Sequence, residues 1–102
     1  MFNNPDLDEF INQMRQIQTF EQLEMYLENW TIYQIDTGIL DNFMRIEMGA
    51  EPDIYKGNLA FKSTQGQYGM GVKPGDYISL DLVKDNLIKM VIAGALTKKS
   101  GE

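Results

Sequence analysis

The sequence predicts an α+β domain in which two N-terminal helices and a C-terminal helix accompany a small, mostly antiparallel sheet. Apolar residues recur at helical spacing near both ends of the chain, and short stretches between them alternate apolar and polar residues as half-buried strands do. With 102 residues, 43 % of them hydrophobic, the chain has material for one core. We therefore expect residues 1–102 to form a single domain, with the last helix packed on the sheet.

The first helix is predicted to begin at Asn4 and Pro5, because Asn is a favoured N-cap and Pro suits the first helical position. Asp6, Asp8 and Glu9 follow in the first turn, where the positive end of the helix dipole stabilises carboxylates. The predicted buried face carries the apolar residues Leu7, Phe10, Ile11, Met14 and Ile17.

A second helix is predicted after Thr19, which with Gln22 matches a capping box. Its apolar stripe consists of Phe20, Leu23, Leu27 and Trp30. Glu21, Glu24 and Glu28 lie on the opposite side, where we expect them to face water. One helix with a kink near Thr19 is the alternative to two separate helices.

Residues 31–48 fit two patterns. Residues 31–35 are rich in β-formers, and Met44, Ile46 and Met48 alternate with charged residues as a strand would. Ile39, Leu40, Phe43 and Met44 also fit the face of a helix. We predict two strands that turn near residues 36–38.

Residues 49–53 are predicted to form a loop, and residues 58–62 and 67–73 a hairpin closed by residues 63–66. Pro74 and Gly75 then occupy the positions that a type II turn favours. Ser79 is the expected N-cap of the last helix, with Asp81 in its first turn. That helix is predicted to extend past Leu96 to residues 98–99.

Charge divides the chain into two unlike halves. Residues 1–53 hold eleven Asp and Glu against two Arg, a net charge of −9, whereas residues 54–102 have a net charge of +3. The asymmetry indicates either an acidic surface for a basic partner or elements that complement each other within one fold.

The chain contains neither cysteine nor histidine. Triads that use His, Cys–His pairs, ordinary zinc sites and haem held by imidazole are therefore excluded, while chemistry by carboxylate, Lys or Tyr stays open. We predict no catalytic residue, no metal and no cofactor, and hence no enzyme. Because no signal sequence or membrane span is recognised and cysteine is absent, we expect a cytoplasmic protein.

Pro52 and Asp53, followed by a strand that ends in Lys62, resemble the core pattern of metal-dependent nucleases, in which Pro-Asp precedes Asp/Glu-x-Lys. Ala60 stands where that pattern has its second acid, so one expected metal ligand is missing. The glycines between residues 66 and 75 lack a phosphate-loop signature and are more simply bends in a hairpin.

The leading hypothesis is a protein-interaction module or inhibitor whose acidic helices occupy a basic surface on a partner protein. Small phage or mobile-element proteins that inhibit host proteins often have this character. The hypothesis therefore includes a phage or mobile-element protein that mimics nucleic acid and blocks a nucleic-acid-binding host protein. Electrostatic attraction would speed the association of such a pair. The candidate binding residues are Asp6, Asp8, Glu9, Glu21, Glu24 and Glu28.

Two alternatives remain. A sheet face that mixes lysines with aromatic rings is typical of domains that bind single-stranded nucleic acid, although a pI of about 4.5 disfavours that function. Its candidate residues are Tyr55, Phe61, Lys62, Tyr68 and Lys73. The other alternative is a structural subunit of a larger assembly, which would form a homo-oligomer.

Overall fold

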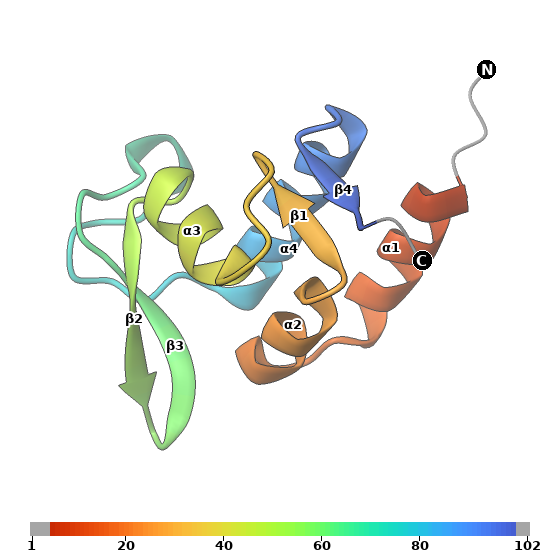
Figure 1. Ribbon diagram of the computed structural model, residues 1–102. Helices are drawn as coiled ribbons and strands as arrows, with labels where there is room; N and C mark the ends of the chain where they lie inside the picture. Colours follow the sequence, from red (N-terminus) through yellow and green to blue (C-terminus); the bar gives the residue numbers. More distant parts are fainter. Residues whose placement is uncertain (1–4, 100–102) are drawn as a thin grey trace.

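A computed structural model of the chain describes residues 5–99 and confirms the α+β class. Within that range it has four α-helices, one short 3₁₀ helix and two small antiparallel sheets of two strands each (Figure 1). The elements follow in the order α1 (Pro5–Gln16), α2 (Phe20–Leu27), β1 (Trp30–Ile32), α3 (Ile39–Ile46), β2 (Ala50–Tyr55), β3 (Asn58–Ser63), the 3₁₀ helix η1 (Tyr68–Met70), α4 (Leu80–Ile92) and β4 (Leu96–Lys98).

The two N-terminal helices are separate. The Thr19 side chain accepts a hydrogen bond from the Gln22 backbone N–H at 3.1 Å, as the capping box predicts. The Gln22 side chain in turn accepts a bond from the Gln18 backbone N–H at 2.8 Å. These bonds cap a new helix, α2, after α1 has ended at Gln16. The single kinked helix is therefore excluded. The predicted cap Asn4 lies outside the described residues.

Between residues 31 and 48 the prediction of two strands is wrong. Only β1 is a strand, and after a tight turn the chain forms α3, with Gly38 in the left-handed conformation at its N-cap (φ 60°). The apolar residues that fitted a helical face are buried together, namely Ile39, Leu40, Phe43 and Met44. Ile46, which an alternating strand would bury, is 56 % exposed.

The predicted hairpin is also displaced along the sequence. β2 begins where we expected a loop, and it pairs with β3 from Ala50↔Ser63 to Tyr55↔Asn58. Residues 67–73 contribute only the isolated Gln67↔Val72 bridge around η1. Pro52 made this strand resemble a loop, but a proline is tolerated in an edge strand, where its missing N–H is not needed.

The last helix starts as predicted and ends earlier. The Ser79 hydroxyl accepts a hydrogen bond from the Leu82 N–H at 3.1 Å, which caps α4. Gly94, in the left-handed conformation (φ 78°), turns the chain out of the helix. Leu96 and the residues after it then form β4, which pairs antiparallel with β1 in the register Ile32↔Leu96. The predicted extension of the helix is therefore wrong.

One hydrophobic core joins these elements. It lies between α1, α2, α3 and α4 and continues beneath the β2–β3 hairpin, which projects to one side in Figure 1. Its largest fully buried side chains include Trp30, Phe10, Phe43 and Phe61. Phe10 packs edge-on against Trp30, with their ring centroids 4.7 Å apart, so α1 is fixed to the start of β1.

Candidate functional site

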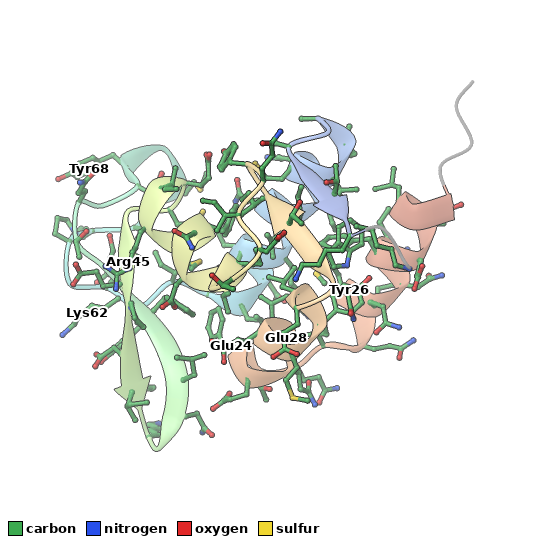
Figure 2. The ribbon with its side chains drawn as sticks, viewed as in Figure 1. Glu24, Tyr26, Glu28, Arg45, Lys62 and Tyr68 are labelled. Atoms are coloured by element: carbon green, nitrogen blue, oxygen red, sulfur yellow. The ribbon has the colours of Figure 1, made fainter. Side chains whose placement is uncertain are left out.

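The α2 helix exposes the predicted acidic stripe. Leu23 and Leu27 are buried on its inner side, which leaves Glu21, Glu24 and Glu28 exposed on the outer side. Figure 2 shows Glu24 and Glu28 projecting from the same part of this helix. Of the three, Glu21 already has a structural partner, because its carboxylate accepts a hydrogen bond of 2.8 Å from the Leu59 N–H on β3.

The acidic residues of α1 are not part of the same site. Glu9 forms an ion pair with Lys98 on β4, with 3.2 Å between Oε2 and Nζ. The Lys98 and Glu9 side chains are 40 % and 49 % exposed, so solvent screens the pair and it contributes little to stability. Asp8 is exposed on α1, and the side chain of Asp6 lies outside the described residues. The five predicted residues whose side chains are described therefore do not converge on one patch.

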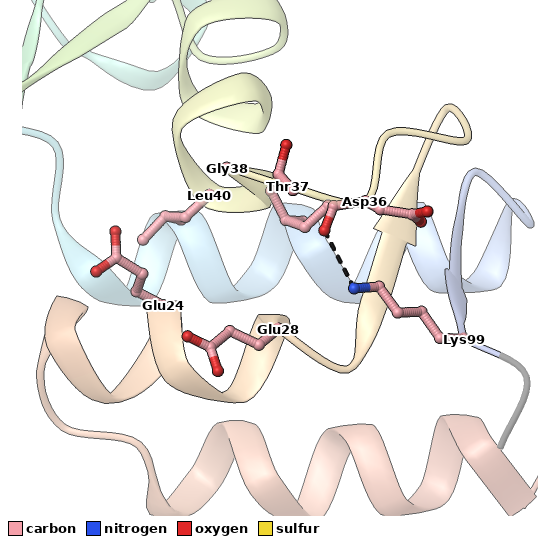
Figure 3. Close-up of a pocket in the computed structure, with 8 residues that line it drawn as sticks. Glu24, Glu28, Asp36, Thr37, Gly38, Leu40 and Lys99 are labelled. Atoms are coloured by element: carbon pink, nitrogen blue, oxygen red, sulfur yellow. Dashed lines mark hydrogen bonds between the residues drawn. The ribbon is translucent and has the colours of Figure 1, made fainter. Parts of the chain in front are cut away.

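Glu24 and Glu28 line a cleft of about 340 Å³ (Figure 3). The helix α2 forms one wall, and the loop before α3 together with the first turn of α3 forms the other. We call this feature the acidic cleft, lined by Glu24, Glu28, Asp36, Thr37, Gly38, Ile39, Leu40 and Lys99.

The carboxylates of the acidic cleft are unmatched by cations. Within residues 5–99, no ion pair joins Glu24 or Glu28 to a basic side chain. The Lys99 ammonium instead donates a hydrogen bond to the Asp36 backbone carbonyl at 3.1 Å, while the Asp36 carboxylate points away from the two glutamates (Figure 3). The first turn of α3, which has no side-chain cap, adds the positive end of a helix dipole to the wall.

Sequence reasoning found the two glutamates but missed the opposite wall. Lys99 reaches the cleft because β4 pairs with β1 and the Lys99 backbone N–H then donates to the Asn29 carbonyl at 2.9 Å. Gly38 contributes because α3 starts there instead of a second strand. No local pattern indicates the position of Lys99, which depends on pairing between distant segments, whereas the helix that starts at Gly38 was the alternative that we did not choose for residues 39–44.

Lysines and a tyrosine of the hairpin, with Tyr77 bridged to Lys62 from the segment before α4, form a second polar surface. We call it the outer hairpin face, made of Asp53, Tyr55, Lys56, Lys62 and Tyr77. The rings of Tyr55 and Tyr77 have centroids 4.7 Å apart. Lys56 lies 5.3 Å from the Tyr55 centroid and Lys62 lies 5.7 Å from that of Tyr77, both within range of a cation–π interaction.

Asp53 also has a partner within the outer hairpin face. The Tyr77 hydroxyl donates a hydrogen bond of 2.7 Å to its carboxylate. That bond, a backbone hydrogen bond at Ile54 and the nearby charge of Lys62 hold the pKa of Asp53 below its ordinary value. The same bond to Asp53 raises the pKa of Tyr77.

The predicted nucleic-acid-binding residues are only partly brought together. Tyr55 and Lys62 share the outer hairpin face, whereas Phe61 points the other way and is fully buried, edge-on to Phe20 at 5.2 Å. Tyr68, 77 % exposed, and Lys73 line a separate shallow hollow in the loop that follows β3. Aromatic and basic residues of the set therefore do not form one stacking surface.

The described part of the chain holds no group of three or more acidic side chains that could bind a metal ion. The nuclease-like pattern places Asp53 and Lys62 on the outer hairpin face, where Asp53 is bonded to Tyr77. Across residues 5–99 no helix combines the length and the apolar character that crossing a membrane requires.

Comparison with protein-family models, with curated protein sequences and with solved structures gives no match for this chain.

Proposed function

We propose that this protein is a non-catalytic binding module that presents its acidic cleft to a basic surface on a partner protein. One observation carries the proposal. Glu24 and Glu28 stand one helical turn apart at the rim of a cleft, exposed and without an ion-pair partner in the described range. Two like charges kept together cost some stability, so their placement is better explained by a partner than by the fold.

The partner is expected to carry arginine or lysine side chains on the surface that meets α2. Opposite fields steer such a pair together and raise its association rate, and the effect weakens as salt is added. Basic surfaces of this kind often hold nucleic acid, so the module would act as an inhibitor that competes for that surface. Origin in a phage or another mobile element belongs to the same proposal.

The test is a charge reversal with a matched control. The variant Glu24→Lys/Glu28→Lys reverses the charge of the two glutamates in the cleft. The control, Asp81→Lys/Asp85→Lys, makes the same change in net charge at two exposed residues one turn apart on α4. Each protein is immobilised, and proteins retained from a lysate of the source organism are quantified by mass spectrometry. Retained candidates are then purified and titrated at low and high salt.

We expect a partner that binds the wild type and the α4 variant but binds the cleft variant at least about tenfold more weakly. Because Glu24 and Glu28 are exposed, unfolding of the cleft variant should change by no more than about 0.5 kcal/mol. A partner that binds the cleft variant as tightly as the wild type would contradict the proposal. Equal loss in both variants would point to unspecific attraction and contradict it as well.

A further inference from the structure

The acidic cleft already contains a cation that belongs to the chain itself. Lys99 is half-buried, and its backbone is fixed beside Asn29 by a hydrogen bond of 2.9 Å. Its ammonium has three donors, one of which bonds to the Asp36 carbonyl at 3.1 Å. An ammonium held by one carbonyl, next to carboxylates it does not pair with, is a weakly bound group.

Lys99 and the two glutamates line the same cleft but do not form an ion pair. Glu24 and Glu28 line one wall of the cleft, and the Lys99 ammonium lies toward the other wall, as Figure 3 shows. No ion pair bridges the two walls within the part of the chain that is described. A head with more donors, spread over a wider plane, is better suited to bond to acceptors on both sides.

The lining of the cleft suits the head of an arginine side chain better than its stem. Ile39 and Leu40 line it, but they are only 4 % and 1 % exposed and offer a stem little apolar contact. An arginine side chain combines an apolar stem with a planar guanidinium that has five donors. That head can bond to carboxylates and to a carbonyl at once, whereas a lysine head is compact and strongly hydrated.

We propose that the acidic cleft binds an arginine side chain of the partner, and that this side chain displaces the Lys99 ammonium from the Asp36 carbonyl. The inference rests on the proposed function and adds the chemical class of the partner group and an internal competitor for it. Lys99 thereby lowers the affinity of the cleft for every cation, and the preference for arginine comes from the bonds that its head makes to the carboxylates and the carbonyl.

The probes are two blocked peptides, one of four arginines and one of four lysines, titrated by calorimetry at low salt. Lys99→Met removes the ammonium and keeps an apolar stem, and Lys89→Met makes the same charge change at an exposed position of α4. We expect Lys99→Met to bind the arginine peptide about three- to fivefold more tightly than wild type, and Lys89→Met less than twofold more tightly. Lys99→Arg places the larger, five-donor head inside the cleft, so it should bind the arginine peptide more weakly than wild type.

A second readout follows the ammonium directly. In the nitrogen-15 spectrum of lysine side chains, the Lys99 signal should shift when the arginine peptide is added to wild type. In Glu24→Gln/Glu28→Gln it should stay in place. This shift reports displacement and is not expected from a variant that merely loosens the fold.

The outcomes separate the two proposals. If wild type and Lys99→Met bind neither peptide better than Glu24→Gln/Glu28→Gln does, the cleft is not a site for basic groups, and the proposed function fails with the inference. If wild type binds and depends on the glutamates, but Lys99→Met equals Lys89→Met or the Lys99 signal does not move, only the internal competitor is overturned. Equal affinity for the two peptides would overturn the preference for arginine.

Discussion

The acidic cleft and the outer hairpin face both gather charged side chains, but they treat those charges in opposite ways. On the hairpin, Asp53 is bonded to Tyr77, and Lys56 and Lys62 lie over tyrosine rings. In the cleft, Glu24 and Glu28 make no ion pair within the described range, and the Lys99 ammonium bonds to a backbone carbonyl instead. Charged residues that already bond to one another are less available to a partner, which is why we propose the cleft, and not the hairpin, as the binding site.

The two regions also differ in their turns. The hairpin turn places Lys56 and Gly57 at positive φ (53° and 83°), and glycine tolerates that conformation at no steric cost. The turn after β1 places Tyr33 and Gln34 at positive φ (52° and 65°) with no glycine at all. The chain segment that leads into the cleft therefore carries backbone strain, which the hairpin largely avoids. Strain of this kind is common near functional sites.

The largest effect is expected beneath the hairpin, where Phe61 was a candidate for nucleic-acid binding. Phe61→Ala removes a fully buried ring and leaves a cavity, so it should lower the free energy of unfolding by about 3–5 kcal/mol, measured by urea denaturation. Tyr55→Ala, on the outer face of the same hairpin, should cost less than about 1 kcal/mol. A small loss at Phe61 would mean that the hairpin is not fixed to the core through this ring.

The capping signals show what sequence alone predicts well in this chain. Thr19 and Ser79 each marked the start of a helix, because a cap is a contact between residues three apart. The ends were harder to predict. Leu96 continues the apolar pattern of α4, but it pairs with Ile32 in a strand because Gly94 turns the chain back.

The same distinction applies to the candidate site. The helical spacing of apolar residues in α2 predicted that Glu24 and Glu28 are exposed, and they are. Their position at a cleft was not predictable, because Lys99 arrives through the pairing of β4 with β1 and Gly38 through the start of α3. Phe61 was assigned to a surface because alternation along a strand does not tell which face is covered.

The next effect concerns the strained turn. Gln34→Gly should stabilise the protein by about 0.5–1 kcal/mol, because glycine takes up positive φ without strain. Gly57→Ala is the matched change in the hairpin turn and should destabilise by a similar amount. Thermal unfolding of the two variants would measure both effects. A loss of stability in Gln34→Gly would mean that the Gln34 side chain has a structural role that outweighs the strain.

A smaller effect tests whether the cleft charges cost stability. Glu28 lies four residues after Glu24 and at the C-terminal cap of α2, where a negative charge opposes the dipole. Glu28→Gln should therefore raise the free energy of unfolding by about 0.2–0.5 kcal/mol. Lys62→Met on the outer hairpin face should lower it by up to about 1 kcal/mol, because the cation over Tyr77 is lost. If the free energy of unfolding changed in the same direction in both variants, the charges of the cleft and of the outer hairpin face would not differ in their effect on stability.

The smallest effect is in the pH dependence of the outer hairpin face. The pKa of Asp53 is lowered in the folded protein. The ionised Asp53 carboxylate therefore contributes to stability above the ordinary pKa of Asp, and this contribution is lost as the pH falls through the lowered value. The pKa of Tyr77 is raised, so its contribution is present below the ordinary pKa of Tyr and is lost as the pH rises through the raised value. The hydrogen bond between the two therefore acts across the neutral range.

Tyr77→Phe removes that bond, and the pKa of Asp53 should rise toward its ordinary value in a carbon-13 titration of the carboxyl groups. Tyr33→Phe is the control, because it removes a hydroxyl that donates to Glu47 and leaves the hairpin unchanged. Tyr77 is 38 % exposed and Asp53 is partly exposed, so water screens the bond, and only the titration itself, not overall stability, is expected to report the change. An unchanged pKa of Asp53 in Tyr77→Phe would mean that the hairpin charges are as unmatched as those of the cleft, and the assignment of binding to the cleft alone would lose its basis.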